Sequence, residues 1–228
     1  MGTPAASAAP SVSTVVQKPV STSPPYSASL SLPQVAWPGH AAVAGRINAA
    51  IQAWAAAQVS AFAATVSKDL AGSAHLPASL PPSSLTITYQ AGLVSAAVVS
   101  LHFTVEPYDR GQAGAVESPA GLTFDLATGS TYSLSGLFRP GAGYIPALAA
   151  QAGTGLQAFH PAGARCYLGR TPAATEASFG AWWLSASGLV LAFPSGTYTA
   201  AYCGAPTVTV PFAALSALAA PGSPLVGA

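Results

Sequence analysis

Residues 121–138 read G-L-T-F-D-L-A-T-G-S-T-Y-S-L-S-G-L-F, and their apolar positions alternate with polar ones. Leu122, Phe124 and Leu126 occupy every second position, which is the period of a β-strand with one buried face. A short turn follows, in which Gly129 can adopt a positive φ, and the alternation then resumes. The pattern predicts a β-hairpin.

Further β-strands are predicted from similar runs of apolar residues. They are expected at residues 27–35, 85–89 and 94–105, as two short strands within 179–193, and at 207–210. Pro33 would place the first strand at a sheet edge or end it, because proline has no backbone N–H to donate to a neighbouring strand. Residues 90–92 are expected to form the turn that joins the second and third strands into a hairpin.

One long helix is expected over residues 40–69, where the large apolar residues fall on one helical face in an alanine-rich background. Shorter helices are expected at 144–159 and 212–219. Strands and helices do not alternate regularly. The pattern therefore predicts an α+β fold, with a mostly antiparallel sheet packed against one long N-terminal helix and shorter helices.

The predicted domain organisation is simple. Residues 1–26 are rich in Pro, Ala, Ser and Thr, a composition typical of a linker, so they are expected to be disordered or extended. An ordinary ragged terminus is the alternative. Residues 27–220 are expected to form a single domain, and residues 221–228 a tail.

The chain of 228 residues has only 6% charged residues and a net charge of +1, which argues against nucleic acid as a partner. Residues 47–67 carry no formal charge and could suggest a membrane span. Their content of Asn, Gln, Ser and Ala leaves too few large apolar residues for one. The sequence therefore predicts a soluble chain.

Cys166 and Cys203 are the two cysteines, and they show no C-x-x-C or metal-binding spacing. A low-charge chain rich in Ser, Thr and Pro favours an exported protein in which these two are bridged, either secreted or tethered at the cell surface. Two buried free thiols are the alternative.

No motif for catalysis, a metal or a cofactor is present. There is no G-x-S-x-G elbow, and the four histidines, His40, His75, His102 and His160, are far apart. Asp125 is expected to face solvent on the polar face of its strand, and His102 is expected to be exposed. The sequence thus shows no motif that announces a reaction.

Two features point to a binding surface. Trp182 and Trp183 are neighbours on a predicted strand and point to opposite faces, so one of them should be partly exposed. With Tyr198 and Tyr202 it would form an aromatic patch for protein or sugar. The alternative is that another element covers the second face.

The second feature is the polar loop at residues 107–119. It holds Asp109, Arg110 and Glu117, and in a chain with few charges this concentration hints at function. A solvated connection is the more frequent explanation. These three residues, with Trp183 and the two tyrosines, form the candidate binding site.

Taken together, these segments resemble the extracellular RsiV-type sensor domain family. That family includes a secreted immunogenic protein of mycobacteria and an N-terminal module of some peptidoglycan deacetylases. The resemblance covers about residues 85–218, and its motifs are 122–138, W-W-L-S-A-S-G-L-V-L-A-F at 182–193 and T-V-T-V-P-F-A-A-L at 207–215. Upstream, A-V-A-G-R-I-N-A-A-I at 42–51 is similar to the helix that begins this domain.

The resemblance implies an exported, non-catalytic domain. It implies that Trp182 points inward and Trp183 outward. The family commonly has Gly-Ala-His or Gly-Thr-His before the F-D-L strand, whereas this chain has Gly-Ala-Val-Glu at 114–117, so a role that depends on that imidazole is not carried over.

RsiV itself is an anti-sigma factor whose outer domain binds lysozyme, a basic protein that favours an acidic surface. With six acidic and seven basic residues this chain fits lysozyme poorly. We therefore expect a binding domain whose partner is another protein or a cell-wall glycan. The alternatives are the sensor ectodomain of a membrane-anchored anti-sigma factor and an accessory module of a cell-wall-acting enzyme.

Overall fold

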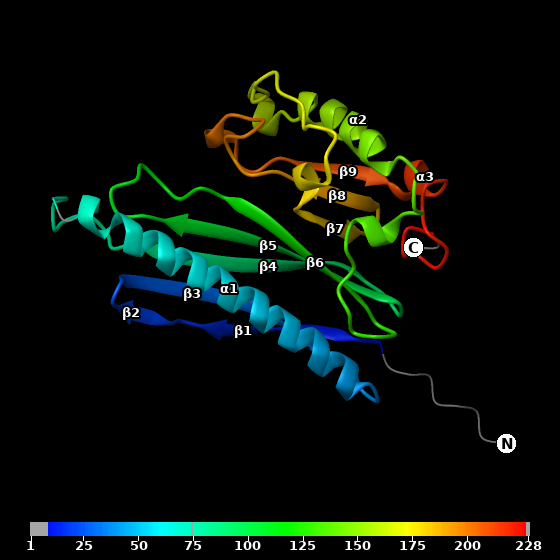
Figure 1. The fold of residues 1–228 in the computed structure, drawn as a ribbon, viewed down its shortest axis with the longest axis horizontal. Helices are drawn as coiled ribbons and strands as arrows, with labels where there is room; N and C mark the ends of the chain where they lie inside the picture. Colours follow the sequence, from blue (N-terminus) through cyan, green and yellow to red (C-terminus); the bar gives the residue numbers. More distant parts are fainter. Residues whose placement is uncertain (1–8, 74, 227–228) are drawn as a thin grey trace.

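The computed structural model describes residues 9–73 and 75–226. It contains two β-sheets, each with its own helix and its own apolar core (Figure 1). The larger sheet packs against a long N-terminal helix, and the smaller sheet packs against a shorter one. This arrangement confirms the predicted α+β fold with a mostly antiparallel sheet.

The larger sheet has six strands in the order β1-β3-β4-β5-β6, with β2 also paired to β3. Its strands are β1 (Ser11–Gln17), β2 (Val20–Thr22), β3 (Pro25–Ala36), β4 (Ser84–Val94), β5 (Val98–Tyr108) and β6 (Ser118–Asp125). The β3–β4 pair is parallel and short, since it joins residues 27–30 to 84–87. Helix α1 (Ala41–Ser73) is the crossover that such a parallel pair requires.

The expected linker at residues 1–26 differs from the structure over part of its length. Residues 1–8 lie outside the described residues. From residue 11 the chain is extended, but as β1 and β2, which are hydrogen-bonded to β3. Val12 and Val15 are half-buried there, and β-branched residues favour such a partly covered sheet position. The sheet therefore begins well before residue 26.

The expected tail also packs on the domain as far as it is described. Ser223 and Leu225 are both buried, and Leu225 belongs to the core of the smaller sheet.

Strand β3 continues through Pro33, which pairs with Thr14 of β1. The side chain of Asn48 on α1 bonds both the N–H and the C=O of Val35, at 2.8 and 2.9 Å, on the side away from β1. Pro33 lies two residues earlier and therefore faces the same side. Strand β4 pairs with β3 only as far as Leu30. Pro33 therefore faces a local sheet edge, where its missing N–H removes no hydrogen bond between strands.

Helix α1 confirms the long helix predicted at 40–69. Its buried residues include Ile47, Ile51, Phe62 and Val66, which pack on the larger sheet. By length and composition alone, the stretch Ala41–Leu70 is the one helix among the described residues that could cross a membrane. Core helices meet the same criterion, and here Ile47, Ile51, Phe62 and Val66 face the sheet, whereas Leu70 is exposed.

The smaller sheet contains β7 (Trp182–Ser185), β8 (Gly188–Ala192) and β9 (Thr207–Pro211), in that order. Helix α2 (Tyr144–Gln157) covers it, and α3 (Phe212–Leu215) follows β9 (Figure 1). Gly155 permits close packing of α2, because a Cβ there would overlap Val208. Short 3₁₀ helices lie at Ser135–Leu137, Pro161–Gly163, Glu176–Phe179 and Ala201–Cys203. The predicted bridge between Cys166 and Cys203 is present.

The two sheets meet where β7 lies against the face of the larger sheet opposite α1. The backbone N–H of Leu184 donates to the Ser100 hydroxyl on β5. The carbonyl oxygens of Trp182 and Leu184 sit directly over Gly121 and Gly92, where any Cβ would overlap them. Glycine is therefore required at both positions for this contact.

This contact explains why the β4–β5 turn lies later than predicted. The turn was expected at 90–92, but β4 runs on to Val94 through a bulge, and the turn occupies residues 95–97. Gly92 allows β7 to approach β4 closely and is not part of the turn. The turn is instead closed by Ser95, whose hydroxyl accepts the N–H groups of Ala97 and Val98.

The hairpin predicted at 121–138 is shorter than expected. Its second strand is reduced to one bridge between Phe124 and Thr131, and a 3₁₀ helix follows at Ser135–Leu137. Leu134 and Leu137 enter the core of the smaller sheet. The chain leaves the larger sheet at this point because these apolar residues are buried in the second core.

Candidate functional site

Trp183 is buried between the two sheets, with 7% of its surface exposed. Its indole packs edge-on against the His102 ring, at a centroid distance of 4.3 Å and an angle of 87°. Trp182 is also 7% exposed. The expectation that one tryptophan is exposed is therefore wrong, because the larger sheet covers the second face of β7. Trp183 does not belong to an exposed binding surface.

His102 was expected to be exposed, and it is half-buried for the same reason. It projects from the face of β5 that meets β7. Burial lowers the pKa of His102 below its ordinary value, because desolvation disfavours the imidazolium. The contact with Trp183 thus holds a neutral imidazole at the sheet interface.

Tyr198 and Tyr202 lie in the segment that leads to the disulfide. Tyr198 is half-buried and packs edge-on against Phe193, at a centroid distance of 5.1 Å. Tyr202 is 79% exposed, and its hydroxyl lies 3.5 Å from the carbonyl oxygen of Arg165. Of the predicted aromatic patch, Tyr202 alone remains well exposed.

Glu117 links the charged loop to this same segment. Its Oε2 accepts the backbone N–H of Ala205 at 3.2 Å, and its carbonyl oxygen accepts that of Ser195 at 3.1 Å. These bonds fix the start of β6 beside the disulfide region. Glu117 therefore has a structural role in the loop.

Asp109 and Arg110 lie at the other end of the loop and contact a different part of the chain. Arg110 donates from Nη2 to the carbonyl oxygen of Pro77 at 2.8 Å, and its backbone N–H donates to the Ser83 hydroxyl. Asp109 faces Asp69 near the end of α1. The six candidate residues thus divide into three locations and do not form one surface.

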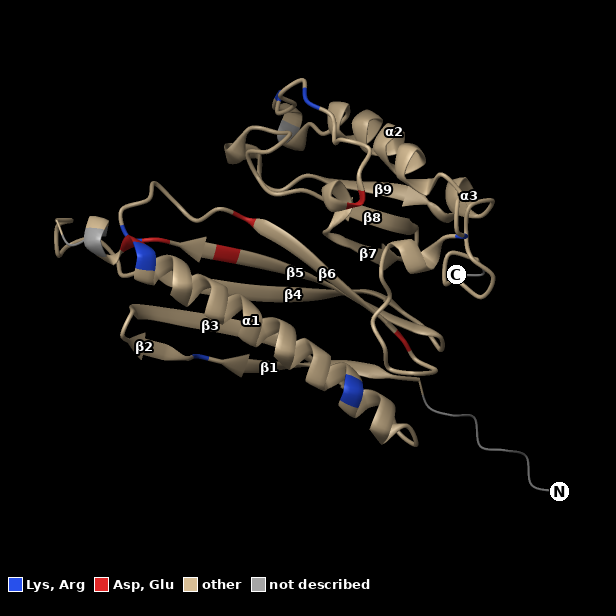
Figure 2. Ribbon diagram, in the orientation of Figure 1, with Lys and Arg blue, Asp and Glu red and all other residues tan. Residues whose placement is uncertain are grey.

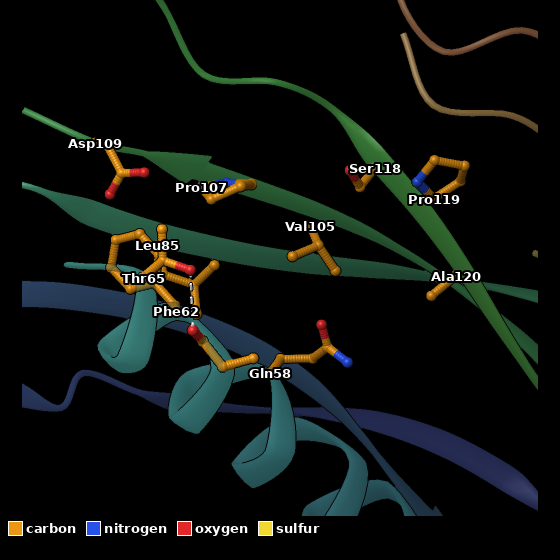
Figure 3. Close-up of a pocket in the computed structure, with 11 residues that line it drawn as sticks. Gln58, Phe62, Thr65, Leu85, Val105, Pro107, Asp109, Ser118, Pro119 and Ala120 are labelled. Atoms are coloured by element: carbon orange, nitrogen blue, oxygen red, sulfur yellow. Dashed lines mark hydrogen bonds between the residues drawn. The ribbon is translucent and has the colours of Figure 1, made fainter. Parts of the chain in front are cut away.

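A hollow of about 440 Å³ lies between α1 and the strands β4, β5 and β6 (Figure 3). Its apolar part comes from the helix, the sheet and two prolines that flank the charged loop: Ala61, Phe62, Leu85, Val105, Pro107, Pro119 and Ala120. Its polar positions are Gln58, Thr65, Asp109 and Ser118. The hollow therefore combines an apolar surface with a few polar groups, as ligand sites commonly do.

A second hollow of about 470 Å³ shares Asp109 with the first. It is lined by the end of α1, the segment that follows α1 and the charged loop: Lys68, Asp69, Gly72, Leu76, Arg110, Gly111 and Gln112. Figure 2 shows that charged residues gather at this end of α1 and β5. We call the two hollows together the α1–β6 groove, with Asp109 at their junction.

Asp109 is the electrostatic centre of the α1–β6 groove. The side chain is partly exposed, but its Oδ1 is shielded from solvent and has no hydrogen-bond partner within the described structure. Its Oδ2 lies 3.5 Å from the Gln112 amide nitrogen. Burial, followed by the negative charge of Asp69, raises the pKa of Asp109. A cation close to this carboxyl group would oppose both effects, because an opposite charge stabilises the carboxylate.

Sequence reasoning found the charged loop but missed most of the groove. Gln58, Phe62 and Thr65 lie on the long helix, and nothing local shows that they face the start of β6. The available signal was the pair of prolines, Pro107 and Pro119, that flank the loop.

Among the described residues, no three His, Cys, Asp or Glu side chains are grouped so that they could hold a metal ion.

No protein-family model and no curated protein sequence matches this chain. Solved structures do share its fold. One is a member of the DUF3298 family from Bacteroides fragilis NCTC 9343, with a TM-score of 0.61 and 12% identity over 96% of this chain and 95% of that chain. Another is a DUF3298 family protein from Pseudomonas aeruginosa PAO1, with a TM-score of 0.59 and 10% identity over 92% and 94%.

These likenesses extend over nearly the whole chain, so the fold is that of DUF3298 family proteins. A shared fold at this sequence identity does not show that this chain and those proteins share a function.

Proposed function

We propose that this chain is an exported, non-enzymatic binding domain of the RsiV-like type, which holds a segment of a partner protein in the α1–β6 groove. The observation that carries the proposal is Asp109, whose Oδ1 is shielded and unpartnered beside an apolar surface. A buried acceptor without a partner typically costs about 1–3 kcal/mol. A ligand that supplies a donor recovers this cost on binding.

The groove suits an extended segment with a lysine or arginine next to an apolar residue. The aliphatic stem of a basic side chain packs on apolar surface while its charged end reaches a carboxylate. Phe62 and Pro107 provide such a surface next to Asp109. Arg110 does not pair with Oδ1, because its Nη2 donates to the carbonyl oxygen of Pro77 and its shielded Nε has no hydrogen-bond partner within the described structure. The partner segment would complete the hydrogen bonding of Asp109.

Export is supported by the bridge between Cys166 and Cys203, since disulfides persist mainly in oxidising compartments. A non-enzymatic role is supported by the lining of the groove. Its ionisable side chains are Lys68, Asp69, Asp109 and Arg110, and it includes no histidine or cysteine among the described residues. This set suits ionic recognition better than proton transfer or nucleophilic attack.

The proposal is tested by selecting peptides from a random displayed library on the immobilised domain. We expect enriched peptides to carry Lys or Arg beside an apolar residue. Lysozyme, the partner that the resemblance implies, is included as a separate probe.

The dissociation constant of an enriched peptide is then measured with variants. Asp109→Asn should weaken binding about tenfold or more, because it removes a charge-assisted hydrogen bond. Thr65→Arg should weaken binding further by filling the groove with a like charge. Glu176→Gln, an exposed carboxylate in a 3₁₀ helix, is the matched control and should have no effect.

Two outcomes would contradict the proposal. One is enrichment of peptides without basic residues, and the other is binding that Asp109→Asn leaves unchanged.

The sensor ectodomain of an anti-sigma factor and the accessory module of an enzyme would use the same groove. A transmembrane segment and a sigma-binding region, or a catalytic domain, in the full gene product would identify them.

A further inference from the structure

We propose a second binding site, for a neutral oligosaccharide, near the N-terminal end of α1. A hollow of about 380 Å³ lies there, between the start of α1, the β4–β5 turn, the end of β6 and the C-terminal segment. It lies apart from the α1–β6 groove, which uses the other half of α1 and shares none of its lining residues. Its volume falls in the usual range of roughly 300–1,000 Å³ for small-ligand pockets.

Aromatic rings form one part of this hollow. The Trp37 indole and the His40 imidazole stack at a centroid distance of 3.8 Å and an angle of 20°. Trp37 is half-buried and also packs against the core of the larger sheet. The rings are therefore held in a fixed arrangement. Flat aromatic side chains of this kind offer apolar surface to the C–H face of a sugar ring.

Polar groups in the same hollow provide both an acceptor and a donor. The Asp125 carboxylate accepts the Ala127 N–H at 2.8 Å through Oδ1, and the Thr128 hydroxyl at 3.0 Å through Oδ2. These bonds orient the carboxylate, and each oxygen retains capacity for a further hydrogen bond. Asp125 can therefore accept from a sugar hydroxyl.

The donor is the phenol of Tyr132. Burial, followed by the charge of Asp125, raises the pKa of Tyr132, so its hydroxyl stays protonated at neutral pH. Asp125 and Tyr132 thus present one negatively charged hydrogen-bond acceptor and one neutral hydrogen-bond donor. Neighbouring hydroxyls of a sugar, each able to donate and accept, match this combination.

The lining also selects against other ligands. Among the described residues, no lysine or arginine lines the hollow, so a phosphate or an acidic sugar would meet the Asp125 charge without a basic side chain of fixed charge to balance it. The remaining lining residues are small or apolar: Ala96, Ala97, Leu126, Ala127, Gly222 and Pro224. These properties favour a ligand that is neutral, flat on one side and rich in hydroxyls.

A smaller neighbouring hollow of about 120 Å³ extends the site. It shares Ala97, Gly222 and Pro224 with the first and adds Ser95 from the β4–β5 turn. Two adjoining hollows that share three lining residues suit a ligand with more than one sugar ring. The class of ligand is therefore an oligosaccharide rather than a monosaccharide.

The test uses titration calorimetry of the intact chain with soluble tetrasaccharides of N-acetylglucosamine, glucose (β-1,4-linked) and mannose. We expect saturable binding of at least one of them. Tyr132→Phe, which removes the donor, should weaken it about tenfold. Ala97→Trp should weaken it more, because Ala97 is exposed, lines both hollows and can carry a large side chain without entering the core.

Ala174→Trp, at an exposed loop position outside the hollows, is the matched control and should bind like the unmodified chain. Circular dichroism confirms the fold of each variant. Asp109→Asn should leave sugar binding unchanged, which separates this site from the groove. Binding of none of the three tetrasaccharides would overturn the proposal, as would binding that Ala97→Trp leaves intact in a folded protein.

Discussion

The hydroxyl oxygen of Ser100 lies 2.7 Å from the backbone nitrogen of Leu184, and this contact joins the two sheets. The same hydroxyl lies 2.7 Å from that of Thr123 on β6. Ser100 and Thr123 are both fully buried. Strand β7 is the edge of the smaller sheet, so its N–H groups need partners outside that sheet. Ser100 supplies one of them from the face of the larger sheet.

Ser100→Ala should therefore destabilise the protein by about 1–3 kcal/mol, because it leaves the Leu184 N–H buried without an acceptor. The free energy of unfolding in urea measures this effect. Ser29→Ala, at an exposed position on β3, is the control and should change stability by less than about 0.5 kcal/mol. Equal stabilities of the two variants would show that the Ser100 contact contributes nothing.

Two glycines should respond to alanine in opposite directions. Gly121→Ala would place a Cβ in the carbonyl group of Trp182, so the sheets must separate and stability should fall by several kcal/mol. Gly45→Ala on α1 meets no neighbouring atom within 4 Å and should stabilise the helix by about 0.5–1 kcal/mol.

Thermal unfolding compares the two glycine variants. A Gly121→Ala protein as stable as the unmodified chain would contradict the close contact between β7 and β6.

The interface should also become less stable in acid. The pKa of His102 is lowered by burial in the folded protein, whereas in the unfolded chain it is near the ordinary 6.5. The unfolded chain therefore binds more protons between these two values. The contribution of His102 to stability is fully present above about pH 6.5 and falls as the pH drops below it.

Urea unfolding between pH 7.5 and pH 5 tests this expectation. His102→Gln cannot titrate, so its stability should vary less with pH than that of the unmodified chain. Parallel pH profiles for the two proteins would count against a desolvated His102.

Local patterns predicted the parts of the fold that depend on one element and one core. The apolar face of α1 and the alternation in β4, β5 and β6 are of this kind. The positions of β1 and β2 could not be predicted, because their valines are half-buried or exposed and their Ser and Thr content matches that of a linker. Gly92 was assigned to a turn because the sequence gives no sign of the distant β7 carbonyl above it.

Local sequence patterns predicted even less of the candidate site, for the same reason. Strand alternation correctly placed Trp182 and Trp183 on opposite faces of β7. It could not show that a second sheet covers the face of Trp183. Conversely, Asp109 was among the candidates, but the role proposed for it depends on Phe62 and Thr65, which are more than forty residues away along the chain.

The short parallel pairing of β3 with β4 has a consequence for how the chain reaches its structure. On either side of residues 27–30 and 84–87 the larger sheet is built from antiparallel pairs between strands close in sequence. Those pairs can form early, since closing a short loop costs little chain entropy. The parallel pair, in contrast, joins two strands that are separated in sequence by the whole of α1. We therefore expect this pairing to be the slow, long-range step that joins two local antiparallel units into one sheet.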